Sequence, residues 1–289
     1  MKLRLSSRWR HFMEGYLFVS PWVIGFLLFM AIPLGQSLYY SLNELKLSRE
    51  GLIATYIGWR HYSDAFTTDI AFLPLLKQTI TSMLVQVPLI MIFSLISALL
   101  LHRPSRGRMI FRGIFFMPVI IASGVILKKL LDQGVAKLPL FTESLYDQLN
   151  LFIPDSILVP VFLFSDKLTP VMWDSGVQIL IFLAGLLTIS ASLYEAARCD
   201  GATRWECFWK ITFPMIMPMI FVNTLFSIVN SFTKADNQVM GYIQTVVNSQ
   251  NKYDYAAALG WIYFIIIFIV LTFVFLIFRK SMTAVEGRA

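Results

Sequence analysis

Six predominantly apolar runs of the chain contain no charged residue, and most of them are as long as a helix that crosses a bilayer. The runs cover residues 16–43, 78–101, 113–127, 175–194, 211–233 and 255–278. A transmembrane helix needs roughly 20 predominantly apolar residues to cross the hydrocarbon. The third run is shorter, but the long stems of Lys128 and Lys129 can reach an interface, which lets a helix continue to residue 131. We therefore predict six spans at about 16–40, 78–101, 111–131, 175–194, 212–233 and 255–278.

The composition supports lipid as the solvent of these runs. Hydrophobic residues make up 57% of the chain and charged residues only 14%, and the mean hydropathy is +0.69. A water-soluble domain of this length does not need so much apolar surface. The expected fold class is an all-α membrane protein of six transmembrane helices, with an N-terminal arm over 1–15, a membrane domain over 16–282 and a tail over 283–289.

The basic residues predict the orientation of the spans. Fourteen of the twenty-four lie on the face that holds both termini, while the opposite face spreads ten over longer loops that also carry twelve of the seventeen acids. The positive-inside rule places both termini in the cytoplasm. The net charge of +7 is therefore mostly an orientation signal, and no basic patch interleaved with aromatic residues indicates nucleic acid as a partner.

The segment 194–214, between the fourth and fifth predicted spans, has the spacing of an amphipathic helix. Its apolar or small residues recur at steps of three or four, at Tyr194, Ala197, Gly201, Trp205 and Phe208. Gly201 permits the positive φ of a turn, so we expect a short helix, a bend and a second helix, with Pro214 at the start of the next span. The mixed charge off this stripe favours a partner protein over a lipid surface.

The same segment contains a motif with fixed gaps. Glu195-Ala196-Ala197 is followed after three residues by Gly201, after nine more by Ile211, and finally by Pro214. This pattern resembles the EAA loop of binding-protein-dependent ABC importer permeases of type I, with Phe213 where the family has leucine. Residues 14–26, 111–118 and 255–261 resemble the sugar and oligosaccharide branch related to the maltose permease subunits. A chance connector is disfavoured because motif, membrane side and flanking spans all agree.

The resemblance implies a type I permease fold and a division of labour among several chains. The loop would form coupling helices in a groove of a separate ATPase subunit, with Glu195 facing a basic residue there. The implied coupling residues are Glu195, Ala196, Ala197, Asp200, Gly201, Ile211 and Pro214. The implied partners are a second permease subunit in a heterodimer, two ATPase subunits, an extracytoplasmic solute-binding protein and a sugar, in the lipid of a bacterial inner membrane.

The chain contains no Gly-Lys dipeptide, so it has no Walker A loop to hold phosphates. We therefore expect it to be a transport subunit without catalytic residues or a bound cofactor, and ATP and Mg to be bound by the partner ATPase. His11, His61 and His102 fall outside the runs and none pairs at metal-ligand spacing, so we expect surface histidines and no metal site.

Polar residues on one face of the fifth span point to a solute pathway or to helix contacts. These residues are Asn223, Ser227, Asn230 and Lys234, at steps of four, three and four. Neutral hydrogen-bonding groups suit an uncharged polyhydroxylated solute. A weaker stripe of Thr79, Ser82 and Gln86, together with Gln178 of the fourth span, could line the same cavity. Packing between helices is an equal alternative for Asn223, Ser227 and Asn230, and the preferred one for Thr79, Ser82, Gln86 and Gln178.

Two other classes of function fit less well. A secondary transporter or channel for a small polar solute is the main alternative, but ion coupling normally requires charged groups within spans, and the six runs have none. An intramembrane enzyme would need a set of catalytic side chains, and histidine and aspartate are missing from the runs.

Overall fold

The computed structural model describes residues 7–48, 51–102, 113, 148–156, 158, 170–234 and 236–286. The third predicted span, 111–131, lies outside the described residues except for position 113. The chain divides into two compact units, Met1–Leu73 with Tyr242–Ile265 and Pro74–Gly241 with Ile266–Ala289.

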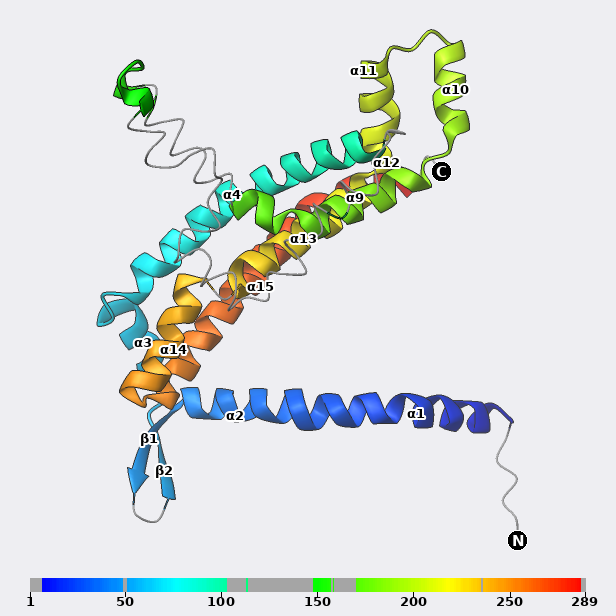
Figure 1. Ribbon diagram of the computed structural model, residues 1–289. Helices are drawn as coiled ribbons and strands as arrows, with labels where there is room; N and C mark the ends of the chain where they lie inside the picture. The colour runs from blue at the N-terminus through cyan, green and yellow to red at the C-terminus, as the bar shows by residue number, and fades with distance from the viewer. Residues whose placement is uncertain are drawn as a thin grey trace. The chain divides into compact units, whose positions relative to one another are not determined.

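The first unit begins with one long helix (Figure 1), made of α1 (Ser7–Phe26), the π-helical turn η1 (Leu27–Ala31) and α2 (Ile32–Ser41). Its apolar side chains are largely exposed, as expected for a surface that lipid or a second membrane chain covers. The π-helical turn lies just before Pro33. Proline has no N–H to continue the ladder, and π adjustments of this kind re-satisfy the freed backbone groups.

A β-hairpin and a short helix follow, and neither was predicted. Strands β1 (Asn43–Ser48) and β2 (Gly51–Tyr56) pair antiparallel from Asn43 opposite Tyr56 to Ser48 opposite Gly51, and α3 (Arg60–Thr67) comes next. The search for charge-free runs passed over this segment because its charged residues break such runs. The all-α expectation is therefore correct for the membrane helices and incomplete for the connection between the first two.

The second unit contains most of α4 (Phe72–His102), α9 (Gly176–Thr188) and α13 (Met217–Thr233). Its core is a cluster of buried apolar side chains from these helices, among them Ala98, Phe182, Leu186 and Ile216. The helices α14 (Gln238–Gln250) and α15 (Tyr253–Glu286) complete the described chain. The segment of α14, for which no helix was predicted, is thus helical.

Within the described residues, three helices are long and apolar enough to cross a membrane: Glu14–Ser41, Phe72–His102 and Tyr253–Arg279. Two sharply bent helix pairs raise the number to five if each pair counts as one span. These five correspond to the first, second, fourth, fifth and sixth predicted spans, and the chain is a multi-pass membrane protein.

The structure moves two of the predicted boundaries. The helix expected over 175–194 ends at Thr188, because Ile189 and Ser190 are extended, and a bend of 62° separates it from α10 (Ala191–Cys199). Pro214 does not begin the next span: helical backbone runs through it to Met215, and the 61° bend falls at Ile216, before Pro218. An absence of charge identifies apolar stretches but does not locate such bends.

Candidate functional site

The predicted loop 194–214 is a helical bracket that joins two membrane helices. It consists of α10, α11 (Arg204–Cys207), the π-helical turn η2 (Phe208–Thr212) and α12 (Phe213–Met215). Figure 1 shows α10 and α11 joined by a short turn at the far end of the bracket from α9 and α12. The expected sequence of helix, bend and second helix is confirmed.

Gly201 makes the bend. Its φ is +80°, in the left-handed region that favours glycine. Its amide donates to the Arg198 carbonyl at 3.1 Å, and the Ala202 amide donates to the Ala197 carbonyl at 2.9 Å. This pair of bonds is the Schellman motif, with Asp200 as the C-cap and Gly201 directly after it. The third residue of the Glu-Ala-Ala motif thus supplies the acceptor that closes α10.

A capping box starts the second arm. The Glu206 amide donates to Thr203 Oγ1 at 3.3 Å, and the Thr203 amide donates to Glu206 Oε2 at 2.8 Å. The hydrogen bonds from Thr203, with nearby Lys210, lower the pKa of the Glu206 carboxyl. Thr-x-x-Glu is a known helix-start signal, so this feature is readable from the sequence alone.

Contacts at the base of the bracket tie its two arms together. The Tyr194 and Thr212 hydroxyl oxygens lie 2.8 Å apart, and both Tyr194 and Ile211 pack against the apolar core cluster of the second unit. A displacement of the bracket would therefore be carried to the membrane helices through packed side chains.

The predicted coupling residues divide between the tip and the base of the bracket. Glu195, Ala196, Asp200 and Gly201 are exposed on α10 and its turn, whereas Ala197, Ile211 and Pro214 are partly buried. Within the described part of the chain, the exposed Glu195 makes no ion pair. Aromatic rings continue the exposed surface, since Trp205 is 70% exposed and its ring lies 5.6 Å from that of Trp209.

Three of the polar residues proposed for a solute pathway bond to one another. Gln178 Nε2 donates to Ser227 Oγ at 2.9 Å, and Asn223 Nδ2 donates to the Gln178 carbonyl at 3.1 Å. Gln178 and Asn223 are fully buried. These contacts join α9 to α13 and are of the kind expected for packing between helices, one of the two alternatives, while within the described residues Gln178 Oε1 and Asn223 Oδ1 have no hydrogen-bond partner. Asn230 is partly exposed and lies outside this group.

A small polar cavity of about 150 Å³ lies elsewhere in the second unit. It brings together Gln86, the remaining pathway candidate, with Thr79 and Ser82 of the same stripe and Lys234 at the end of α13; packing between helices was the preferred prediction for the first three. Lys234 Nζ lies 3.5 Å from a carboxylate oxygen of both Asp174 and Asp236, which the sequence analysis did not connect. Burial raises the pKa of the Asp174 carboxyl, and Lys234 opposes this effect.

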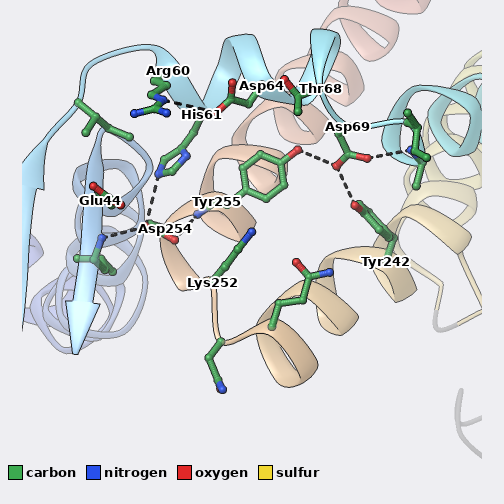
Figure 2. A pocket seen from close by; sticks show the side chains of 16 residues that line it. Glu44, Arg60, His61, Asp64, Thr68, Asp69, Tyr242, Lys252, Asp254 and Tyr255 are labelled. Carbon is green, nitrogen blue, oxygen red and sulfur yellow. Dashed lines mark hydrogen bonds and ion pairs between the residues drawn. The ribbon is translucent and has the colours of Figure 1, made fainter. Parts of the chain in front are cut away.

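The first unit holds a larger cavity of about 780 Å³, whose walls are held together by two carboxylates (Figure 2). Asp69 Oδ2 accepts from the hydroxyls of Tyr242 at 2.8 Å and Tyr255 at 2.7 Å, and its other oxygen accepts from two backbone amides at the start of α4. Burial raises the pKa of Asp69, but these hydrogen bonds outweigh it and lower the pKa overall. Burial and the bond to Asp69 raise the pKa of Tyr242 to about 12.

Asp254 is the second of these carboxylates. Its Oδ2 accepts from the Leu45 amide at 2.9 Å and lies 3.5 Å from His61 Nε2. His61 is therefore not a plain surface residue: it is partly buried, with its ring 5.8 Å from that of Tyr255. Within the described residues, no group of three or more His, Cys, Asp and Glu side chains could hold a metal ion.

Apolar helices joined by an exposed, capped helical bracket form the arrangement that the resemblance to importer permeases predicts. Residues 71–283 match the model of the binding-protein-dependent transport system inner membrane component, and the chain belongs to this family. It is 36% identical over 227 residues to the probable ABC transporter permease protein YesP of Bacillus subtilis, covering 76% of this chain and 70% of YesP. It is 27% identical to the lactose transport system permease protein LacF of Rhizobium radiobacter, covering 80% and 77%.

A solved structure supports the same fold. The chain is similar to a chain of a bacterial ABC transporter that imports the acidic polysaccharide alginate, with a TM-score of 0.69, 21% identity, and coverage of 95% of this chain and 99% of the other. The same transporter in complex with an alginate pentasaccharide-bound periplasmic protein gives a TM-score of 0.68. The fold is that of a type I ABC importer permease.

Proposed function

We propose that this chain is the membrane-spanning permease subunit of a bacterial inner-membrane importer that takes up a sugar or oligosaccharide delivered by an extracytoplasmic solute-binding protein. Relatives named for the transport of lactose and arabinooligosaccharides support this class of solute. The alginate importer, solved with its periplasmic protein, supports the kind of partner. Both termini would be cytoplasmic, as the basic residues predict.

The observation that carries the proposal is the bracket that presents Glu195. This carboxylate lies exposed on α10, whose end is closed by Gly201 and whose base is fastened by the Tyr194–Thr212 contact. A bracket that is rigid, exposed and packed against the core at its base can pass on the movement of another protein. The moving partner would be one of two ATPase subunits, with ATP and Mg bound there and a basic side chain facing Glu195.

Transport has a direction if the ATPase partner has two states that make different contacts with the bracket. Closure of the ATPase pair would bring this bracket and that of a second, different permease subunit together and turn the helices outward-facing, so that solute enters from the binding protein. Separation of the pair would reverse the movement. This chain contributes shape, hinge bends at 189–190 and 216, and polar walls, and no chemical step.

The test is a purified complex reconstituted in vesicles with Glu195→Gln and Glu195→Lys. We expect both to lower nucleotide-dependent uptake, the lysine variant more strongly because it places like charges together across the predicted contact. Glu44→Gln is the matched control, since Glu44 is a half-exposed acid on the opposite predicted face. Full uptake by both Glu195 variants, or uptake that needs no nucleotide, would contradict the proposal and favour a secondary transporter.

A further inference from the structure

The small cavity of the second unit has a wall of neutral polar groups within a membrane helix. Thr79, Ser82 and Gln86 recur at steps of three and four on α4, so they share one face of it. Within the described residues, none of these three side chains bonds to another protein group. Polar groups at membrane depth are costly unless a partner satisfies them or they line a water-filled cavity. The side chains of this wall are therefore suited to contact water or a polar solute.

The opposite wall carries charge, but the lysine in it is already neutralised. Lys234 is mostly buried and shares its ammonium between Asp174 and Asp236, at 3.5 Å from each. Lys234 and Asp236 line the cavity and Asp174 does not, but the group of three, counted as one positive and two negative charges, leaves an excess of one negative charge beside it. A carboxylate brought into the cavity would meet this excess, while hydroxyl groups would meet only hydrogen-bonding partners.

We infer that this cavity is a subsite for one uncharged sugar unit and that it rejects sugar acids. Its volume of about 150 Å³ leaves room for water or for one small polar ring. The inference rests on the proposed function and deepens it, because relatives include transporters named for neutral sugars and for polygalacturonan. Membership of the family does not distinguish these two kinds of solute, and the charge of the cavity favours a neutral sugar for this chain.

The charge of the cavity can be measured with a single cysteine. Ser82→Cys is introduced into the full chain after Cys199→Ser and Cys207→Ser, and the complex is labelled at neutral pH with a cationic and an anionic methanethiosulfonate reagent. We expect the cationic reagent to react faster by on the order of a hundredfold, because one unit charge at about 6 Å and an effective dielectric near 40 changes each rate about tenfold, in opposite directions for the two reagents. Rates at Ser63→Cys, an exposed position outside the cavity, correct for the intrinsic reactivity of the two reagents.

Two variants show whether the ion group sets this preference. Asp236→Asn removes one negative charge and leaves Lys234 paired with Asp174, so the ratio of rates should fall to near one. Glu44→Gln, which removes an acid of the first unit, should leave the ratio unchanged. A faster anionic reagent in the starting protein, or a ratio that Asp236→Asn does not alter, would overturn the inferred charge selection.

Occupancy is tested by protection from a neutral methanethiosulfonate. The probes are galactose with galacturonate and glucose with glucuronate, pairs that differ only in whether C6 is a hydroxymethyl group or a carboxylate. We expect at least one neutral sugar to slow labelling of the cysteine at 82, and its acid to require about tenfold more for equal protection. Equal protection by the acid, or no protection by either neutral sugar, would overturn the subsite.

This experiment needs neither ATP nor the binding protein, so the two proposals can fail separately. Normal nucleotide-dependent uptake with a reversed labelling preference would reject only the subsite. The expected labelling in a protein whose uptake needs no nucleotide would reject only the proposed coupling to an ATPase.

Discussion

Gly201 offers the sharpest test of the bracket, because its substitution changes conformation without changing contacts. A Cβ added at Gly201 would have no heavy atom within 4 Å, and its φ is +80°. The whole effect of Gly201→Ala is therefore the strain of a left-handed L-residue, about 1–2 kcal/mol. That free energy shifts the equilibrium between closed and open turn by roughly 5–30-fold.

The Ala202 amide reports this equilibrium directly. It donates to the Ala197 carbonyl at 2.9 Å only while the turn is closed, so its hydrogen exchange in the purified complex should accelerate by about the same factor. Asn at 201 should have a smaller effect, since asparagine tolerates the left-handed region, and valine a larger one. Uptake per ATP hydrolysed should fall in the same order.

Gly260→Ala is the matched control. Its added Cβ also has nothing within 4 Å, and its φ lies outside the left-handed region, so alanine within α15 should be neutral or stabilising by about 0.5–1 kcal/mol. If Gly201→Ala and Gly201→Val left the exchange of Ala202 unchanged, the bend would not depend on the positive φ and the reasoning would be refuted.

Three further substitutions test packing and electrostatics. Gly185→Ala places a Cβ 2.5 Å from Met219 Cγ and should lower stability by about 1–3 kcal/mol in thermal melts, with Met219→Ala relieving most of the loss; additive effects would refute the contact. Asn223→Ala should lower stability by about 1 kcal/mol and leave the solute concentration for half-maximal uptake unchanged, whereas a change in that concentration alone would indicate solute contact. Asp69→Asn should lower the free energy of unfolding at neutral pH by about 1.5–3 kcal/mol, because a neutral amide oxygen accepts weaker hydrogen bonds than a carboxylate oxygen. Folding lowers the pKa of the Asp69 carboxyl from 3.8. The contribution of Asp69 to stability is therefore complete above pH 3.8 and is lost as the pH falls through the lower folded pKa. The difference in the free energy of unfolding between variant and wild type should shrink over that acidic range.

Much of the bracket could be predicted because its signals are local. The positive φ at Gly201 and the two helices around it follow from one glycine within an amphipathic pattern, and the capping box at Thr203 needs only four residues. The spans 78–101 and 255–278 were equally readable, since a long apolar run in lipid has few alternatives to a helix. The hairpin over Asn43–Tyr56 was missed because a search for charge-free runs is blind to strands that carry charges.

The sequence by itself indicated the apolar stretches that correspond to five helical segments of the described chain, and where the bracket bends. Only the tertiary structure showed which neighbour each polar side chain contacts, because a stripe along a helix shows that residues share one face but not which side chains they meet. Asn223 and Ser227 share a face with Lys234, yet the first two bond to Gln178 on α9, while Lys234 joins Asp174 and Asp236 beside Gln86. Partners distant in sequence meet only when the helices pack. That packing places Asn223 and Ser227 in a contact between helices and Lys234 in the wall of the cavity.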